Sequence, residues 1–355
     1  MALLEVADLR VTLATARGAV EALRGIDFAL DRGQTLGLIG ESGCGKSMTA
    51  LALMGLLPEG ARVAGSIRFD GRELVGLDDA AWRALRGDRI GMIFQEPMTA
   101  LNPLHRVGRQ IAEPLRVHRG MDARAARAEA LRLLERVRLP DAARRIDAYP
   151  HQLSGGQRQR VMIAIALACG PALLIADEPT TALDVTIQAQ ILALIAELVA
   201  EDGMALLLIS HDLGVIARNV QRMLVMYGGS VVESGPTRAI FARLAHPYTR
   251  GLFAARPRLG ATKVGRLQTI PGRVPELADL PAGCPFSDRC GYVIQACRAA
   301  LPAAIEVAPG HAARCIRVHE IDGLAASPAL TPALSQGERE QEGSVRVEPP
   351  PSGSG

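Results

Sequence analysis

Three short apolar runs, each followed by polar or glycine residues, form the expected core of the chain. Residues 36–39 precede a glycine-rich turn, residues 172–176 end at two carboxylates, and residues 205–210 end at a histidine. Continuous apolar runs of this length are typical of strands in a parallel sheet that is buried on both faces. Ligands bind beyond the carboxyl ends of such strands. The pattern predicts an α/β fold whose polar strand ends gather at one edge.

Two further patterns predict what surrounds this core. Residues 1–35 alternate apolar and polar side chains, which predicts a small antiparallel β region. Residues 122–139 place apolar side chains such as Leu133 and Val137 on one face and arginines on the other, which predicts an amphipathic helix. A solvated face explains these arginines more simply than contact with nucleic acid does.

Length and composition limit the classes of protein to consider. At 355 residues, of which 48% are hydrophobic, the chain exceeds one typical domain. We therefore expect one large domain and a smaller appendage. Basic and acidic side chains number 40 and 37, for a net charge of +3. Because this balance gives no electrostatic footprint for nucleic acid, we expect no nucleic-acid partner.

No segment predicts secretion or membrane insertion. Glu5 and Asp8 interrupt the N-terminal stretch, which therefore does not fit a secretory signal. The longest uncharged apolar run, residues 161–176, contains Gly170 and Pro171 and is shorter than the roughly 20 residues that a spanning helix needs. We expect a cytosolic chain that does not cross a membrane by itself.

Residues 40–47, GESGCGKS, fit the phosphate-binding pattern GxxxxGK[ST] and lie between a predicted strand and a predicted helix. Backbone N–H groups of such a loop surround an anion, and the helix N-terminus favours phosphate. We expect Lys46 to bind the β- and γ-phosphates of ATP and Ser47 to ligate Mg²⁺. A chance glycine-rich turn is the alternative, but Lys46 is one of only two lysines in the chain. The predicted contacts of the loop with the nucleotide come from Gly40, Glu41, Ser42, Gly43, Cys44, Gly45, Lys46 and Ser47.

Asp177 and Glu178 follow the second apolar run and are predicted to face the phosphates. Asp177 would hold the water shell of Mg²⁺, and Glu178 would orient or deprotonate the attacking water. Capping of the next helix is the plainer alternative for this pair. His211 follows the third run and is predicted to sense the γ-phosphate, although a histidine at a strand end is more often structural.

A second anion-binding pattern, LSGGQ at residues 153–157, precedes an apolar helix. Ser154, Gly155 and Gly156 are predicted to form a helix N-terminus that is free to meet phosphate. Because the chain already has one complete phosphate loop, this second pattern predicts a site for the ATP of another molecule. It therefore predicts a dimer with ATP between the subunits.

LSGGQ between a phosphate loop and a strand ending in Asp-Glu resembles the ABC ATPase family over residues 1–255. The resemblance implies a P-loop NTPase fold with a mostly parallel core sheet, an antiparallel β subdomain and a helical insertion at about 96–165. It implies that Gln95 links Mg²⁺ and the water to a membrane partner. It also implies signature-loop contacts from Gln157, a place for Asp184 at the dimer seam, and a switch role for His211.

Two departures from the family pattern affect the expected nucleotide site. The family stacks an aromatic residue on adenine, but Leu13 to Ile26 contains none, and Val20 lies about where that residue is expected. This predicts purely apolar contact with the base. Cys44 stands where similar loops often have serine, and it leads us to expect that thiol alkylation blocks ATP hydrolysis.

Residues 95–115 and the segment HPYTRGL at 246–252 resemble the ATPases of oligopeptide and dipeptide uptake. That resemblance implies four partners: a second and distinct ABC ATPase, two membrane permeases and an extracytoplasmic solute-binding protein. It also places the chain peripherally on the cytoplasmic face of the bacterial inner membrane. Other cargo, such as nickel or glutathione, stays open because the other subunits read the cargo.

Four of the six cysteines lie late in the chain, at Cys284, Cys290, Cys297 and Cys315. None forms the CxxC pair that is typical of zinc knuckles. The segment resembles the C-terminal region of oligopeptide and dipeptide transporter ATPases, which implies a [4Fe-4S] cluster in a structural role. Zinc, and cysteines that are unliganded or in disulfides, remain the alternatives.

The sequence predicts three parts, a nucleotide-binding domain at 1–255, a small cysteine-containing domain at 256–322 and a disordered tail at 323–355. Two other classes of protein compete with an importer subunit. A soluble ABC protein acting on nucleic acid or ribosomes commonly carries two cassettes, whereas this chain has one LSGGQ. A non-catalytic regulatory protein is the other.

Overall fold

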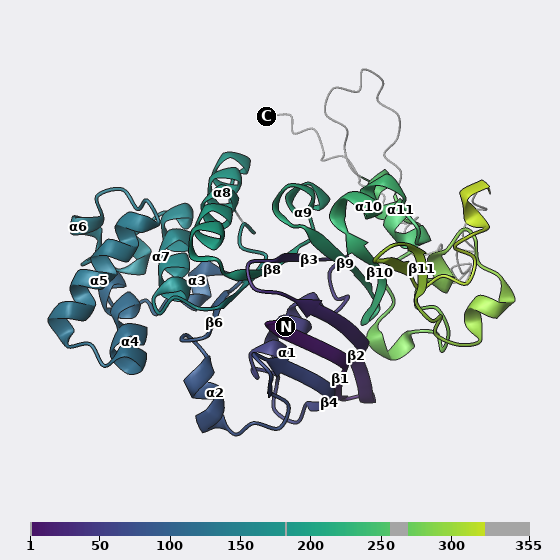
Figure 1. Ribbon diagram of the computed structural model, residues 1–355, viewed down its shortest axis with the longest axis horizontal. Coiled ribbons are helices and arrows are strands. Elements are labelled where there is room, and N and C mark those ends of the chain that lie inside the picture. The colour runs from purple at the N-terminus through teal and green to yellow at the C-terminus, as the bar shows by residue number, and fades with distance from the viewer. Residues whose placement is uncertain (1, 182, 256–268, 324–355) are drawn as a thin grey trace, which may run out of the picture.

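A mixed eight-stranded sheet forms the centre of the molecule in the computed structural model, which describes residues 2–181, 183–255 and 269–323. Its strand order is β11-β12-β10-β9-β3-β8-β7-β6. The five strands from β9 to β6 are parallel, and the other three join them antiparallel. Figure 1 shows this sheet crossing the middle of the molecule, with α8 and α9 above it and α1 below it.

The strands of the core sheet are β3 (Thr35–Ile39), β6 (Ile90–Ile93), β7 (Leu173–Asp177), β8 (Ala205–Ser210), β9 (Arg222–Tyr227), β10 (Ser230–Pro236), β11 (Ile305–Ala308) and β12 (His311–Ala313). The helices are α1 (Lys46–Leu53), α2 (Asp79–Leu85), α3 (Pro97–Ala100), α4 (Val107–Arg119), α5 (Ala123–Arg136), α6 (Ala142–Arg145), α7 (Gly155–Leu167), α8 (Val185–Asp202), α9 (Leu213–Asn219), α10 (Thr237–Ala242) and α11 (Pro247–Ala254). Short 3₁₀ turns lie at Pro150–Gln152, Leu277–Asp279, Ser287–Arg289, Gln295–Arg298 and Ile321–Gly323.

Each face of the core sheet has its own apolar layer. Alternate residues of β7 point to opposite faces, so Leu174 packs in the layer with α7 and α8, whereas Ile175 packs in the layer with α1. Every residue of β7 and β8 is buried. The predicted parallel strands, buried on both faces, are therefore confirmed.

A second, antiparallel sheet packs below the core and has the order β2-β1-β4-β5. Its strands are β1 (Leu4–Thr15), β2 (Gly18–Leu30), β4 (Arg62–Phe69) and β5 (Arg72–Glu73). The N-terminal hairpin agrees with the predicted β region at 1–35. β4, which pairs with β1 in this sheet, was not predicted from the sequence.

The predicted helical insertion is present as α3 to α7, and Figure 1 shows these helices grouped at one end of the sheet. In α5 the buried residues are Ala126, Ala130, Leu133 and Leu134. Its arginines form surface ion pairs, for example Arg127 with Asp147 at 2.7 Å. The amphipathic helix and its solvated arginine face therefore match the prediction.

The C-terminal part of the chain does not stand apart from the core. β12 pairs with β10 through Glu233↔Ala313 and Ser234↔Ala312, so the β11–β12 hairpin extends the central sheet. The predicted boundary at residue 255 therefore separates strands that belong to one sheet. The predicted tail falls on residues 324–355, which lie outside the described residues.

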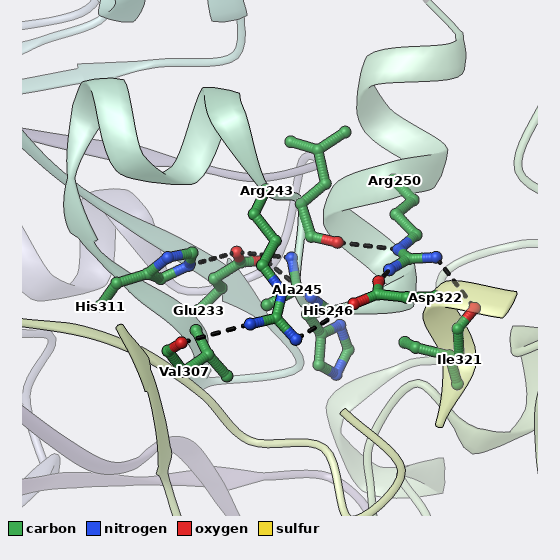
Figure 2. Close-up of polar contacts among 10 residues, drawn as sticks. Glu233, Arg243, Ala245, His246, Arg250, Val307, His311, Ile321 and Asp322 are labelled. Atoms are coloured by element: carbon green, nitrogen blue, oxygen red, sulfur yellow. Dashed lines mark hydrogen bonds and ion pairs between the residues drawn. The ribbon is translucent and has the colours of Figure 1, made fainter. Parts of the chain in front are cut away.

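A buried carboxylate joins the two parts. Glu233 on β10 is 1% exposed, and its carboxylate accepts hydrogen bonds from the backbone N–H groups of Ala245 and His246 at 2.9 and 2.8 Å. The Nε2 atom of His311, on β12, lies 2.8 Å from the same carboxylate (Figure 2). Three bonds thus satisfy a charge that would be costly to bury alone.

Two arginines complete this attachment at the surface. Arg243 donates to the Val307 carbonyl and to Asp322, and Arg250 donates to the Ile321 carbonyl and to Asp322 (Figure 2). Because the Asp322 side chain is about half exposed, these pairs add less stability than the buried contact of Glu233 does.

Replacing His311 by Leu should lower the free energy of unfolding by about 1.5–3 kcal/mol, because Glu233 loses one hydrogen bond to a charged group. Urea unfolding followed by circular dichroism measures this change. The matched control is His319→Leu, since His319 is exposed. Equal unfolding midpoints for the two variants would contradict the role assigned to His311.

Candidate nucleotide site

The loop of residues 40–47 joins β3 to α1, as predicted, and α1 begins at Lys46. At two positions of this loop only glycine fits the backbone conformation and the close packing. Gly40 has φ 159°, and a Cβ atom there would lie 2.3 Å from the Met226 carbonyl oxygen. Gly45 has φ 107°, and its Cβ would lie 2.8 Å from Leu23. The glycines therefore let the loop press against β9 and β2.

Lys46 lies inside this loop. Its side chain is buried, and its Nζ donates to the carbonyls of Gly40 at 2.8 Å and Glu41 at 3.1 Å. The ammonium group is therefore held beside the backbone that is predicted to cradle phosphate.

Cys44 points into the core rather than toward solvent. It is fully buried, and burial raises the pKa of its thiol. Since the thiolate is the reactive form, a buried neutral thiol is inert. Because the thiol is buried, the expectation that alkylation of Cys44 blocks hydrolysis loses its physical basis. The sequence alone does not reveal that this side chain faces the apolar layer.

Asp177 ends β7 next to the phosphate loop. Burial raises the pKa of its carboxyl, and a hydrogen bond from Ser47 opposes that shift. Its Oδ1 atom is buried without a hydrogen-bond partner among the described residues. An oxygen in this state fits a nearby cation or its water shell, because Mg²⁺ uses one or two protein oxygens together with water and phosphate.

Two predicted residues, Gln95 and His211, meet at the carboxylate of Glu178. Gln95 Nε2 lies 3.5 Å and His211 Nδ1 lies 3.1 Å from Glu178 Oε2. The hydroxyl of Thr181 donates to the same oxygen at 3.0 Å. Thr181 was missed in the sequence, and its spacing of three residues from Glu178 was the only available signal. The group can position a water at a strand end.

The backbone of Glu178 is itself unusual. Its φ is 45°, which is in the left-handed region that non-glycine residues seldom adopt. Its backbone N–H donates to the Ile209 carbonyl at 3.0 Å, so β8 holds the strained residue in place. Strain of this kind concentrates at functional sites.

The LSGGQ residues begin α7, as predicted. Ser154 is the N-cap, its hydroxyl accepts from the Gln157 backbone N–H, and the Gln157 side chain accepts from the Ser154 N–H at 3.1 Å. A Cβ on Gly156 would lie 2.8 Å from Ile187, so this glycine lets the loop approach α8. The exposed helix start is suited to an anion.

Asp184 caps α8. Its side chain accepts a hydrogen bond from the Ile187 backbone N–H at 2.9 Å and is exposed. This local bond explains the residue without a second subunit. The neighbouring Ala182 lies outside the described part of the chain.

A pocket of about 510 Å³ lies beside the phosphate loop. One side comes from the β1–β2 hairpin and the loop, and the other comes from the C-terminal part of the chain. Its apolar lining and loop contacts include Leu13, Val20, Ser42, Gly43, Pro275 and Leu277. Arg17 binds Asp279 at 2.5 Å and Glu276 at 3.0 Å, which ties the hairpin to the C-terminal wall. No local pattern in the sequence indicates that the C-terminal part of the chain forms this second wall.

The HPY segment also contacts the loop. The Glu41 backbone N–H donates to the Tyr248 hydroxyl at 2.8 Å. Tyr248 packs against Tyr227 and Phe286, with ring centroids 4.7 and 5.3 Å away. Burial raises the pKa of the Tyr248 phenol, so it remains a neutral hydrogen-bonding group. Tyr248 was not among the predicted site residues.

The four late cysteines line one cavity of about 20 Å³, which has room for about one water. Burial raises the pKa of Cys284 to about 12 and that of Cys290 to about 11. Within the described ranges, no three His, Cys, Asp or Glu side chains lie close enough to hold a metal ion. The described arrangement therefore contains no preformed site for the predicted iron–sulfur cluster.

Known proteins with this combination of parts identify the family. The model of the family "ABC transporter" matches residues 23–181, and that of "Oligopeptide/dipeptide transporter, C-terminal region" matches residues 232–297. The oligopeptide transport ATP-binding protein OppD of Salmonella typhimurium is 51% identical over 89% of this chain and 93% of its own. This chain is an ABC transporter ATPase of the oligopeptide/dipeptide type.

Other similarities agree with this assignment. A Brucella melitensis protein named as a candidate peptide import ATP-binding protein is 51% identical over 90% of this chain and 98% of its own. A dimeric ATP-binding cassette in a post-hydrolysis state, bound to ADP and Pi, is 30% identical, with a TM-score of 0.60 over 66% of this chain and 99% of its own. The ABC ATPase fold and the use of ATP and Mg²⁺ are thus confirmed. Among the helices of the described segments, none is both long and apolar enough to cross a membrane.

Proposed function

We propose that this ABC ATPase powers the import of dipeptides or oligopeptides, with Glu178 as the residue that activates water. The convergence of Gln95, Thr181 and His211 on one Glu178 oxygen is the observation that carries this proposal. Peptide cargo is supported by OppD and the Brucella relative, whose names describe peptide transport.

In this proposal the phosphates of ATP lie in the loop of residues 40–47. Lys46 exchanges its bonds with the Gly40 and Glu41 carbonyls for phosphate oxygens. Mg²⁺ neutralises phosphate charge when bound, and Ser47, Gln95 and the orphaned oxygen of Asp177 are suited to hold it or its waters. Glu178 accepts the proton of the attacking water, and His211 contacts the γ-phosphate.

The LSGGQ start of α7 serves the ATP of a partner ATPase. The exposure of Ser154 and Gly155 supports this role, because both remain accessible to another molecule. The solved dimeric cassette is a precedent for pairing in this family. Asp184 then lies at the seam while it caps α8.

The complete machine would contain a second ABC ATPase, two membrane permeases and an extracytoplasmic solute-binding protein. The chain would sit peripherally on the cytoplasmic face of the inner membrane, with residues 95–115 receiving a permease helix. The resemblance to OppD supports this assembly.

Glu178→Gln should reduce ATP hydrolysis by about 10²–10⁴-fold, because the amide cannot take the proton from water. ATP binding should persist, and ATP should trap a closed pair of ATPase subunits that light scattering detects. The matched control is Glu197→Gln, since Glu197 is an exposed α8 residue that pairs with Arg138. Full turnover of the reconstituted Glu178→Gln transporter would refute this mechanism.

The base of ATP is proposed to occupy the pocket between Val20 and Leu277. Both walls offer apolar contact and no aromatic ring among the described lining residues. Leu277→Ser should weaken ATP binding about three- to tenfold, or about 1 kcal/mol of lost apolar contact. Fluorescence titration with labelled ATP measures this. The control Ile294→Ser changes an exposed residue of the same part of the chain. Unchanged affinity for Leu277→Ser would exclude this site for the base.

The cysteine group is proposed to hold an iron–sulfur cluster once its thiols lose their protons. Four thiols line one cavity, of which Cys315 is partly exposed and the other three are buried, and they support the donor set. The cavity must open, because it now has room for one water.

Protein purified without oxygen should contain about four irons per chain and matching acid-labile sulfide. Cys297→Ser should abolish this content, whereas Cys169→Ser, a buried thiol at the end of α7, should retain it. Elemental analysis reads the result directly. Zinc in place of iron, or a fully functional chain free of metal, would refute the cluster.

A further inference from the structure

The second residue of the phosphate loop is a carboxylate, and the C-terminal part of the chain binds it. Arg289 donates to Glu41 Oε2 through Nη1 at 2.7 Å and to Oε1 through Nη2 at 3.2 Å. This is the bidentate geometry in which arginine binds a carboxylate most strongly. Arg289 immediately precedes Cys290, so the contact links the cysteine group to the phosphate loop.

Arg289 is built into its position rather than resting on the surface. Its side chain is only 5% exposed. Nε donates to the Pro271 carbonyl at 2.8 Å, and Nη1 donates to the Tyr227 hydroxyl at 3.3 Å. Nη2 also donates to the carbonyls of Ile270 and Gly272 at 3.5 and 3.4 Å. The guanidinium therefore stays in place to meet Glu41.

The position of Glu41 makes this pairing important for ATP. A phosphate loop works by presenting N–H groups and a positive charge to an anion. A free carboxylate in the same loop would repel the triphosphate. Arg289 cancels that charge, and Tyr248 holds the Glu41 backbone N–H from behind. Both contacting residues, Arg289 and Tyr248, come after β10 in the chain.

We propose that Arg289 is a positioning residue of the nucleotide site, which neutralises Glu41 and thereby allows the phosphate loop to bind ATP. The proposal rests on the proposed placement of the phosphates at residues 40–47. It makes the cysteine-containing part of the chain a component of the ATP site, whether or not that part holds a cluster.

A double-mutant cycle in the full chain tests this role. Arg289→Gln should weaken the binding of a fluorescent ATP analogue about tenfold, because Glu41 is left unpaired. Glu41→Gln added to Arg289→Gln should recover most of that affinity, since no free carboxylate remains. The matched control is Arg298→Gln, because Arg298 forms an exposed pair with Asp288 in the same region. Its affinity should equal that of the unmodified chain.

The outcomes separate charge neutralisation from simple structural support. If the double variant binds ATP as weakly as Arg289→Gln does, the proposal is overturned. A purely structural role of Arg289 predicts that neutralising Glu41 recovers none of the lost ATP affinity. Should Arg289→Gln fail to fold, Arg289→Lys keeps the charge and should bind with intermediate affinity that falls less than tenfold. If the Arg289→Lys variant binds ATP as tightly as the unmodified chain does, both without and with added salt, that result would also count against the bidentate contact. If the unmodified chain binds no ATP, the proposed function fails instead.

Discussion

The phosphate loop must present backbone N–H groups to an anion on one side while distant parts of the chain pack against its other side. Met226 lies against Gly40, Leu23 lies against Gly45, and Lys46 is bonded to the loop carbonyls. Tyr248 adds a contact from the C-terminal side. The shape of the loop is therefore fixed by its surroundings from several distant parts of the chain. Close packing of this kind leaves little room for a loop to change shape gradually.

The chemistry of the site follows from the register of the parallel strands. Ile39 pairs with Ser210, and Asp177 pairs with Ile209, so β3, β7 and β8 end at nearly the same level. That common edge is why Glu178 and His211, 33 residues apart, share a hydrogen bond. The helices on both faces stabilise the strands, whereas the residues just beyond the strands remain available for reaction.

Much of the fold and of the site could be predicted because the relevant signals are local. The glycines and Lys46 define a loop and the start of a helix within eight residues. Ser154 and Gln157, three residues apart, form the N-terminal cap of α7. The contacts that were missed join distant residues, such as Tyr248 with Glu41, which are 207 residues apart. No local pattern specifies the partner of a buried polar group. Cys44 was misjudged for the same reason, since burial of a loop side chain depends on the layer packed behind it.

The pairing of β12 with β10 has a consequence for where this chain can be divided. A chain ending after α11 would leave the N–H and C=O groups of β10 unpaired along the rim of the central sheet. Bare rims of this kind recruit strands from other molecules. In the intact chain β12 occupies that position, and the outermost strand is β11, with only four residues. The β11–β12 hairpin therefore protects this edge of the sheet against self-association, independently of anything that the four nearby cysteines bind.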